Sequence, residues 1–187
     1  CGLASGIIRI GTFSSVATHW LPNIIRTFQN DYPGMDYELF LGDYIEIEQA
    51  LIKGRIDCGF LRMPANPALA LREVEKDELL AVLPIGHPLA ELDAVTPKQL
   101  AGESFLLLEK DENTGVSEVF ERAHVKLKPH VTLWDDYAIM SMVEKGLGVS
   151  VLHSLTLKRI PYRVAVRPLK PRAFRTIGFA TKKGSAA

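Results

Sequence analysis

The sequence predicts an α/β protein built of two Rossmann-like α/β lobes. Residues 7–61 alternate short apolar strands with amphipathic helices, a pattern typical of parallel sheets with helical crossovers. A second series of strands and helices begins near residue 78 and repeats several boundary residues of the first. A connector rich in proline, residues 63–67, separates the two series.

The first strand and helix lie in residues 7–28. A strand with three isoleucines leads into a turn of small residues at 11–15, and apolar residues then recur at spacings of three and four. Pro22 has no N–H with which to continue a helical hydrogen-bond ladder. The helix is therefore expected either to kink there or to restart near Leu21, which would leave the serines in a preceding turn.

The next elements complete the first lobe. We expect a strand at 37–41, a helix at 44–53 and a buried strand at 58–61. Asp43 and Glu46 have the spacing of a capping box, in which each side chain accepts a backbone N–H of the first helical turn.

The second lobe is expected to contain strands and helices in similar alternation. The strands of this lobe are expected at 78–84, 104–108, 131–134 and 149–152, and its helices at 97–100, 116–123 and 136–145. Two late strands are also expected in the chain, at 162–166 and 176–180.

The two lobes share an internal repeat. Gly42-Asp43-Tyr44 before one helix and Lys53-Gly54 after it are matched by Asp135-Asp136-Tyr137 and Lys145-Gly146, with the second copy one residue shorter. Ligands of open α/β sheets bind beyond the carboxyl ends of the strands. Two facing lobes would place both sets of strand ends on one cleft.

Composition excludes several classes of protein. The 22 basic and 22 acidic residues give a net charge of zero, which argues against direct nucleic-acid binding by this chain. The two cysteines, Cys1 and Cys58, argue for a reducing cytosol rather than a disulfide framework. No signal peptide or apolar span, metal-ligand spacing, G-x-S-x-G elbow, phosphate loop or catalytic acid pair stands out. We therefore expect no cofactor, no membrane contact and no enzyme activity.

The turn at Ser14 and Ser15 is the first candidate ligand site. Its hydroxyls and backbone N–H groups are suited to an anion such as a carboxylate. Simple helix capping is an equally good explanation from the residues alone, and both stay open.

Three further positions carry possible ligand chemistry. Asp43 is a candidate for binding an ammonium group, although capping explains it better. Arg62 follows a buried strand and is either a bidentate carboxylate clamp or a solvated hinge residue. Thr114 and Gly115 lie at the start of a helix of the second lobe. They are either backbone N–H donors to the ligand or, more simply, an ordinary helix cap.

Four stretches in order resemble the effector-binding domain of LysR-type transcriptional regulators: IRIGTFSSVATHWLPNIIRTFQNDYPG, GDYIEIEQALIKGRIDCGFL, GHPLAELDAVTPKQLAGESFLLL and DDYAIMSMVEKGLGVSVL. The resemblance covers most of the chain. It implies a fold like type II periplasmic binding proteins, in which two crossover segments join the lobes, with lobe I at residues 1–61 and 164–187 and lobe II at 62–163. A small, anionic effector is expected between the lobes.

The resemblance also assigns contacts and partners. The implied ligand-binding residues are Ser14, Ser15, Val16, Asp43, Arg62, Thr114 and Gly115. An aspartate at position 43 favours a zwitterion over a plain anion, unless it serves only as a cap. The family implies a cytoplasmic homodimer, with a tetramer for the full-length protein. Trp20 is a candidate for the dimer surface and also for the core.

Two family elements are expected to be absent from this chain, namely the final helix and the N-terminal winged helix-turn-helix. DNA would be bound only through that winged helix-turn-helix. Two alternatives are a periplasmic solute-binding protein and an enzyme on the same scaffold.

Overall fold

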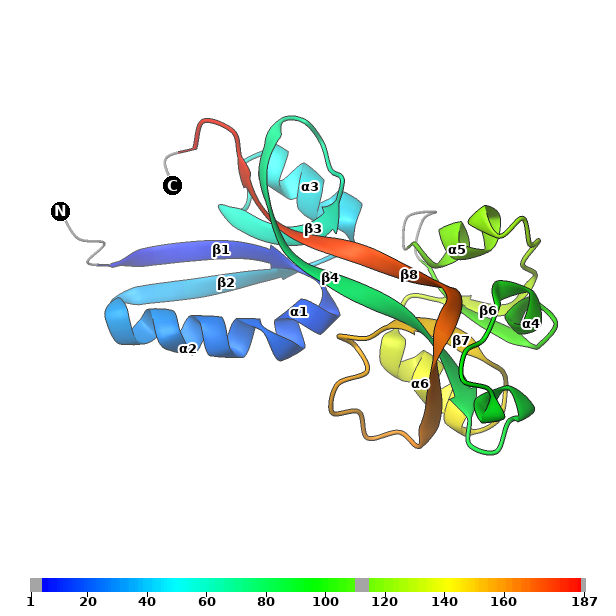
Figure 1. Ribbon diagram of the computed structural model, residues 1–187. Helices are drawn as coiled ribbons and strands as arrows, with labels where there is room; N and C mark the ends of the chain where they lie inside the picture. The colour runs from blue at the N-terminus through cyan, green and yellow to red at the C-terminus, as the bar shows by residue number, and fades with distance from the viewer. Residues whose placement is uncertain (1–4, 110–114, 186–187) are drawn as a thin grey trace. The chain divides into compact units, whose positions relative to one another are not determined.

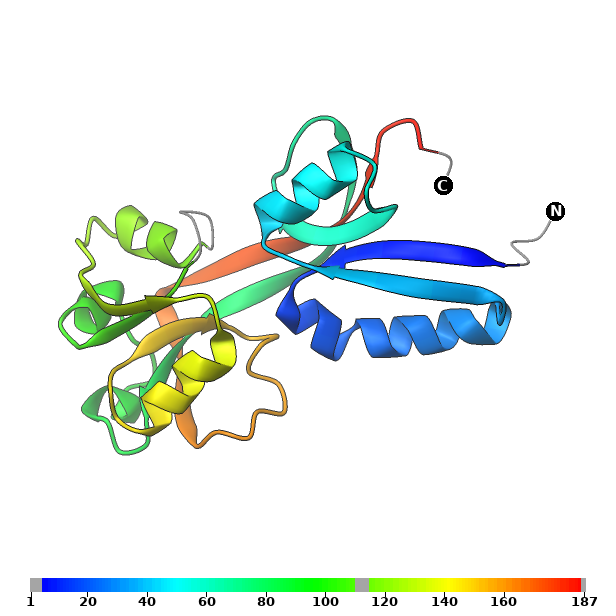
Figure 2. The same ribbon diagram turned by 180° about the vertical axis from the view of Figure 1, so that it is seen from behind.

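The computed structural model describes residues 5–109 and 115–185 and shows the predicted α/β fold (Figures 1 and 2). The chain divides into two compact units, which we call unit 1 (Cys1–Lys76 and Thr176–Ala187) and unit 2 (Asp77–Arg175). It passes between them inside two long strands, β4 (Leu69–Pro84) and β8 (Val164–Lys182).

Unit 1 contains a largely parallel sheet with helices on both faces (Figure 1). Besides its parts of β4 and β8, its elements are β1 (Gly6–Thr12), α1 (Ser14–His19), α2 (Leu21–Asp31), β2 (Met35–Leu41), α3 (Tyr44–Ile52) and β3 (Cys58–Met63). Strand β1 lies between β2 and β3 and is parallel to both, as the β-α-β-α-β alternation predicts. Strand β3 then pairs with the end of β8 in antiparallel orientation.

The two faces of this sheet are covered by different helices. Trp20, between α1 and α2, packs edge-on against Phe60 of β3, with ring centroids 5.9 Å apart. Helix α3 covers the opposite face, where a Cβ on Gly11 would lie 2.9 Å from Ile47. Gly59 approaches the same isoleucine, so two neighbouring strands need glycine where α3 packs closely.

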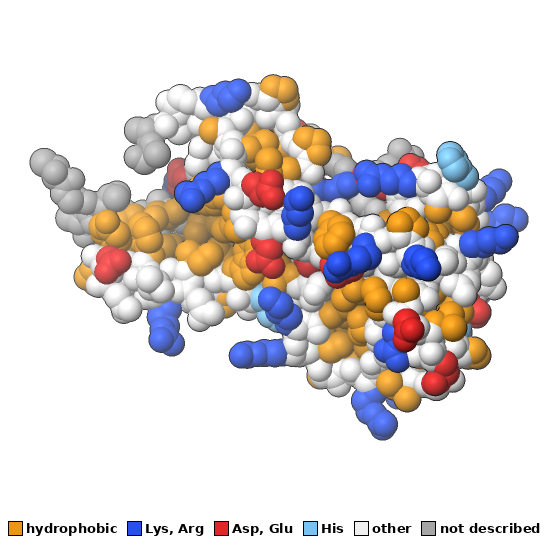
Figure 3. Space-filling model, viewed as in Figure 1, with side chains coloured by type: hydrophobic (Ala, Val, Ile, Leu, Met, Phe, Trp, Pro, Cys, Tyr) orange, Lys and Arg blue, Asp and Glu red, His pale blue; other side chains and the backbone are white. Residues whose placement is uncertain are grey.

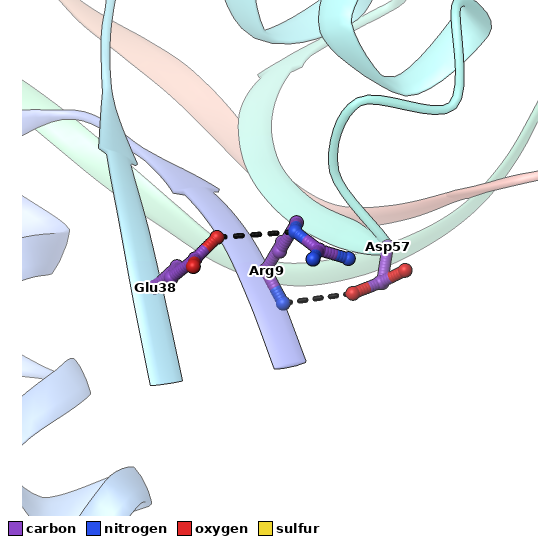
Figure 4. Close-up of polar contacts among 3 residues, drawn as sticks. All are labelled: Arg9, Glu38 and Asp57. Carbon is purple, nitrogen blue, oxygen red and sulfur yellow. Dashed lines mark hydrogen bonds and ion pairs between the residues drawn. The ribbon is translucent and has the colours of Figure 1, made fainter. Parts of the chain in front are cut away.

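Polar contacts among Arg9, Glu38 and Asp57 fix the register of β1 in the sheet (Figure 4). The backbone N–H of Arg9 donates to Asp57 Oδ2 at 2.8 Å, and the N–H of Asp57 donates to the Arg9 carbonyl at 2.9 Å. The Arg9 guanidinium reaches across to Glu38, its register partner on β2, at 3.1 Å. Asp57 therefore supplies a side-chain acceptor to a β1 N–H just before β3 begins.

The first helix is interrupted, as Pro22 suggested. Helix α1 ends at His19, and α2 restarts at Leu21 with Pro22 in its first turn, where a missing N–H costs nothing. The restart is therefore the correct alternative. The expectation that the serines then lie in a turn is wrong, because Ser14 and Ser15 begin a short helix of their own.

Unit 2 holds the remaining elements. Between β4 and β8 they are a 3₁₀ helix, η1 (Pro88–Glu91), then α4 (Pro97–Ala101), β5 (Phe105–Leu108), α5 (Val116–Arg122), β6 (Pro129–Leu133), α6 (Asp136–Glu144) and β7 (Ser150–His153). Strand β7 is antiparallel to β4, and β5 is parallel to β6. A bridge between Phe105 and Val149 connects the two pairs. Phe105 and Phe120 meet edge-on in one buried cluster, while Ile139, Met140 and Val143 of α6 lie in a second.

The structure corrects two strand predictions. The strand expected at 78–84 begins at Leu69, and the two late strands are one continuous strand, β8. The internal repeat also needs a different alignment. Helices α3 and α6 are both nine residues long, with Asp43 and Asp135 as their N-caps. The two copies are therefore equal in helix length, and Asp135 rather than Asp136 corresponds to Asp43.

Candidate functional site

The predicted ligand turn lies where β1 ends in unit 1. Ser14 is exposed at the start of α1, whereas Ser15 and Val16 are buried. Phe13 precedes them in an extended conformation, and no side chain caps the helix. Since α1 enters directly from a parallel strand, its first-turn N–H groups lie at the carboxyl edge of the sheet.

Asp43 lies at the same edge, after β2. The N–H of Gly42 donates to the Thr12 carbonyl at 3.1 Å, and Phe13 packs edge-on against Tyr44 with centroids 5.2 Å apart. These contacts bring the ends of β1 and β2 together. The structure thus places Asp43 beside the turn of α1 within unit 1.

The capping box predicted for Asp43 is confirmed. Its Oδ1 accepts the Glu46 N–H at 2.7 Å, and Glu46 Oε2 accepts the Asp43 N–H at 2.8 Å. Asp43 is buried, so these bonds offset the cost of removing a carboxylate from water. The start of α3 therefore already carries a carboxylate of the protein itself.

Arg62 belongs to β3 itself and does not follow the strand, as the sequence had suggested. It pairs with Ile177 of β8. Gly11 aligns with Gly59, so continuing that register places Arg62 beyond the last residue of β1. Its position is therefore at the carboxyl edge of the same sheet as Ser15 and Asp43.

The second-lobe candidates are only partly visible. Thr114 lies outside the described residues. Gly115 is the N-cap of α5, with φ of 83°, a left-handed conformation that glycine adopts without strain. The sequence correctly placed it at a helix start.

Sequence reasoning missed an acidic pair at the start of α6. Asp135 caps the helix by accepting the N–H groups of Tyr137 and Ala138 at 2.9 and 3.0 Å. Asp136 is half-buried, and this burial raises its pKa to about 6, helped by the charge of Asp135 and opposed by Arg175. The repeat with Asp43 was the signal that pointed to this position.

Cys58 is a small, largely apolar residue of the sheet in unit 1. It is half-buried at the start of β3. Burial raises the pKa of its thiol to about 11, and the adjacent Asp57 charge acts in the same direction. A thiol with so high a pKa is a poor nucleophile at neutral pH.

Residues 5–109 and 115–185 offer neither a membrane-spanning helix nor a cluster of metal ligands. In this part of the chain no helix is both long and apolar enough to cross a membrane. Over the same residues, no cluster of three or more histidine, cysteine or acidic side chains is placed to hold a metal ion.

Known proteins resemble the whole chain. The family described as "LysR substrate binding domain" matches residues 2–187. LrrA of Synechococcus elongatus, a "probable HTH-type transcriptional regulator", is 35% identical over 96% of this chain and 61% of its own length. YvbU of Bacillus subtilis, an "uncharacterized HTH-type transcriptional regulator", is 30% identical over 96% of this chain and 62% of its own. The chain thus spans about three fifths of these relatives.

A solved structure of an effector-binding domain has the same fold as this chain. The BenM effector-binding domain with its effector benzoate is 26% identical and superimposes with a TM-score of 0.82, over 97% of this chain and 85% of that one. The curated relatives are transcriptional regulators and not enzymes, which argues against the alternative of an enzyme on this scaffold. Sequence, fold and relatives together show that this chain belongs to the LysR family, as the effector-binding domain of a LysR-type transcriptional regulator.

Proposed function

We propose that the effector of this domain is a small carboxylate bound in a cleft between the two units. The observation that carries the proposal is the benzoate, a carboxylate, held by the BenM domain of the same fold. The contacts we propose are those expected from the sequence, namely Ser14, Ser15, Val16, Asp43 and Arg62 of unit 1 with Thr114 and Gly115 of unit 2.

The chemistry of unit 1 supports a carboxylate at α1. Backbone N–H groups at a helix start that no side chain caps are suitable donors to an anion, and the Ser15 hydroxyl adds another donor type. Arg62 lies at the same edge of the sheet, and a guanidinium offers the planar geometry that carboxylates accept from arginine. Charge-assisted hydrogen bonds of this kind are about twice as strong as neutral ones.

The other helix starts limit the charge of the effector. Helices α3 and α6 are capped by Asp43 and Asp135, and Asp136 follows. These carboxylates would repel a second negative charge and would favour an ammonium or hydroxyl group. We therefore propose a monocarboxylate with a polar or cationic second group, such as an amino or hydroxy acid, over a dicarboxylate.

The effector acts, in this proposal, by shifting the equilibrium between arrangements of the two units. It can do so only by its difference in affinity for those arrangements. The remainder of the protein would then read out the shift.

The wider assembly is also a proposal. The matched relatives are HTH-type regulators, and this chain covers about three fifths of their length. This supports a cytoplasmic protein that binds DNA through a separate N-terminal domain. A homodimer, and a tetramer for the full-length protein, is supported by the exposed apolar surface of unit 1. The exposed side chains there include Ile7, Ile24, Leu39, Leu41 and Ile45, and Figure 3 shows hydrophobic side chains gathered along β1.

A thermal-shift screen tests the effector class. Benzoate, amino acids, hydroxy acids and dicarboxylates are added to the purified domain. A ligand at 100 times its Kd should raise Tm by about 5–10 °C. We expect the responding compounds to be monocarboxylates, and we expect Ser15→Ala and Arg62→Ala to lose most of the shift.

Matched controls are available on α2. Thr27→Ala and Arg26→Ala remove a hydroxyl and a guanidinium from exposed positions of the same unit and should respond like the parent. If Ser15→Ala and Arg62→Ala also respond like the parent, the site assignment is wrong. If only dicarboxylates or uncharged compounds shift Tm, the proposed effector class is wrong.

A further inference from the structure

A buried ion pair stands where the two long strands leave unit 1. Asp77 is the first residue of unit 2 on β4, and Arg175 is its last residue on β8. Arg175 Nε donates to Asp77 Oδ2 at 2.8 Å, and Arg175 Nη2 forms an ion pair with the same oxygen at 2.6 Å. The two side chains are only 4% and 3% exposed, so the pair is shielded from solvent and salt.

The same carboxylate holds a third segment of unit 2. Asp77 Oδ1 accepts the N–H of Leu155 at 2.9 Å, just after β7. Next to it, the Glu78 carbonyl accepts the N–H of Ser154 at 2.7 Å. The Asp77 side chain therefore joins β4, β8 and the turn after β7 at one point.

The strand segments beside this point are exposed. Residues 72–76 of β4 are exposed without interruption, and burial begins at Asp77. On β8, residues 170–174 are mostly exposed, and burial begins at Arg175. Glu78 and Arg172 also connect the two strands, through bonds of 2.6 and 2.7 Å, but the Arg172 side chain is 64% exposed. Exposed ion pairs contribute little, and exposed strands with few apolar contacts open readily.

A buried ion pair seldom adds much net stability over an apolar pair of similar size, because both ions lose their hydration. Its best-attested use is to specify one register over others. Slippage of β4 against β8 would separate Asp77 from Arg175 and break their ion pair in the interior. Exposed strands that lack a buried face have no comparable penalty against slippage.

We propose that Asp77 and Arg175 form a register lock on the two strands that connect the units. The lock keeps β4, β8 and the turn after β7 in one alignment, so that any movement of the units is taken up on the unit 1 side of the pair, where residues 72–76 of β4 are exposed. The inference rests on the proposed function only in that effector binding is what would drive such movement. The lock itself exists without an effector.

The test is made on the effector-free domain and has two readouts. Hydrogen exchange followed by mass spectrometry reports peptides that contain Leu155 and the two exposed segments. Electron paramagnetic resonance measures distances between spin labels at Arg26→Cys and Lys98→Cys, one exposed position in each unit, in a background with Cys1→Ser and Cys58→Ala. The distance distribution of the parent is the reference for the variants.

Two variants remove the lock in different ways. Asp77→Asn removes the charge but keeps a similar shape. The double variant Asp77→Leu with Arg175→Met replaces the pair by apolar groups and keeps the fold accessible if the single variant unfolds. In either folded variant we expect exchange near Leu155 to accelerate about tenfold or more and the distance distribution to broaden or split.

Arg172→Ala is the matched control, because it removes the exposed ion pair on the same two strands and should leave both readouts unchanged. A folded lock variant with the parent's distance distribution would overturn the proposal, even if its Tm falls, since a merely structural pair would affect stability alone. Failure of the effector screen would not affect this outcome, because no effector is used here.

Discussion

At the residue scale, Asp136 is the clearest case of a group that the fold itself has perturbed. Its pKa rises to about 6 because the carboxyl is removed from water, although the charge of Arg175 opposes the rise and that of Asp135 adds to it. A carboxyl whose pKa is raised by folding makes a favourable contribution to the free energy of unfolding when it is protonated. This contribution is complete below the unfolded-state pKa near 4 and is lost as the pH increases through 6.

Asp136→Asn should therefore stabilise the domain at pH 7.5, where the native carboxylate is charged. The gain should be about 1–2 kcal/mol, allowing for partial solvent screening, and should disappear near pH 4. Thermal melts from pH 4 to pH 8 measure the difference. Asp36→Asn, at an exposed position of β2, is the control and should change Tm little at either pH. A gain that is the same at pH 4 and pH 7.5 would contradict the assigned cause.

Individual residues were predictable from sequence where their partners are local. The capping box of Asp43 and Glu46 spans three positions and was predicted correctly. Asp77 and Arg175 are 98 residues apart, and nothing in the local pattern connects them. Arg62 was placed after its strand because the apolar run ends at Leu61, whereas pairing with β8 extends the strand to Met63.

At the element scale, the two glycines after α6 have different roles. Gly146, with φ of 77°, ends the helix, as the sequence suggested. Gly148 is required for a different reason, because a Cβ there would overlap the backbone of Ser104, with the carbonyl carbon 3.0 Å away. This close approach lets the Val149 N–H donate to the Ser104 carbonyl and connects β5 with β7.

Gly148→Ala should therefore destabilise the domain by about 1–3 kcal/mol, through forced separation of two backbones in a packed region. Urea unfolding followed by circular dichroism measures the loss. Gly6→Ala is a suitable control, since its Cβ would meet only the Met35 side chain at an ordinary distance of 3.5 Å. Equal stability of Gly148→Ala and the parent would show that this contact is not constrained.

The long strands explain why two elements were mispredicted. Residues 72–78 of β4 carry six charged side chains and lack the apolar alternation by which a half-buried strand is identified. Strand β8 contains Pro168 and Pro171, which normally demote a strand prediction. Both segments are extended because neighbouring strands pair with them, a cause that local periodicity does not contain.

At the scale of the whole molecule, β2 is the edge of the sheet of unit 1. Leu39 on this strand is 49% exposed, and Leu41 is more exposed still. Exposed apolar side chains on an unpaired edge favour association with another chain. This supports the dimer proposed above.

We expect the isolated domain to dimerise and Leu39→Glu to shift it to monomer without loss of Tm, because a charge placed at an apolar interface must be desolvated. Sedimentation velocity over a range of protein concentrations measures the change. Val74→Glu changes an equally exposed apolar residue on β4 and should remain dimeric. Leu39→Glu that sediments like the parent dimer would exclude this edge from the interface.

The sequence by itself determined the α/β class, the parallel orientation of β1, β2 and β3, the cap of α3, and the family to which the chain is similar. These features depend on short-range periodicity, on turn residues and on ordered motifs, all of which lie within a few positions of one another. Only the tertiary structure decided that β4 and β8 are long continuous strands, that Arg62 lies within β3, and that Asp77 and Arg175 meet. Each of these depends on pairing between distant segments, whose free energy is realised only when the chain has closed the loop between them.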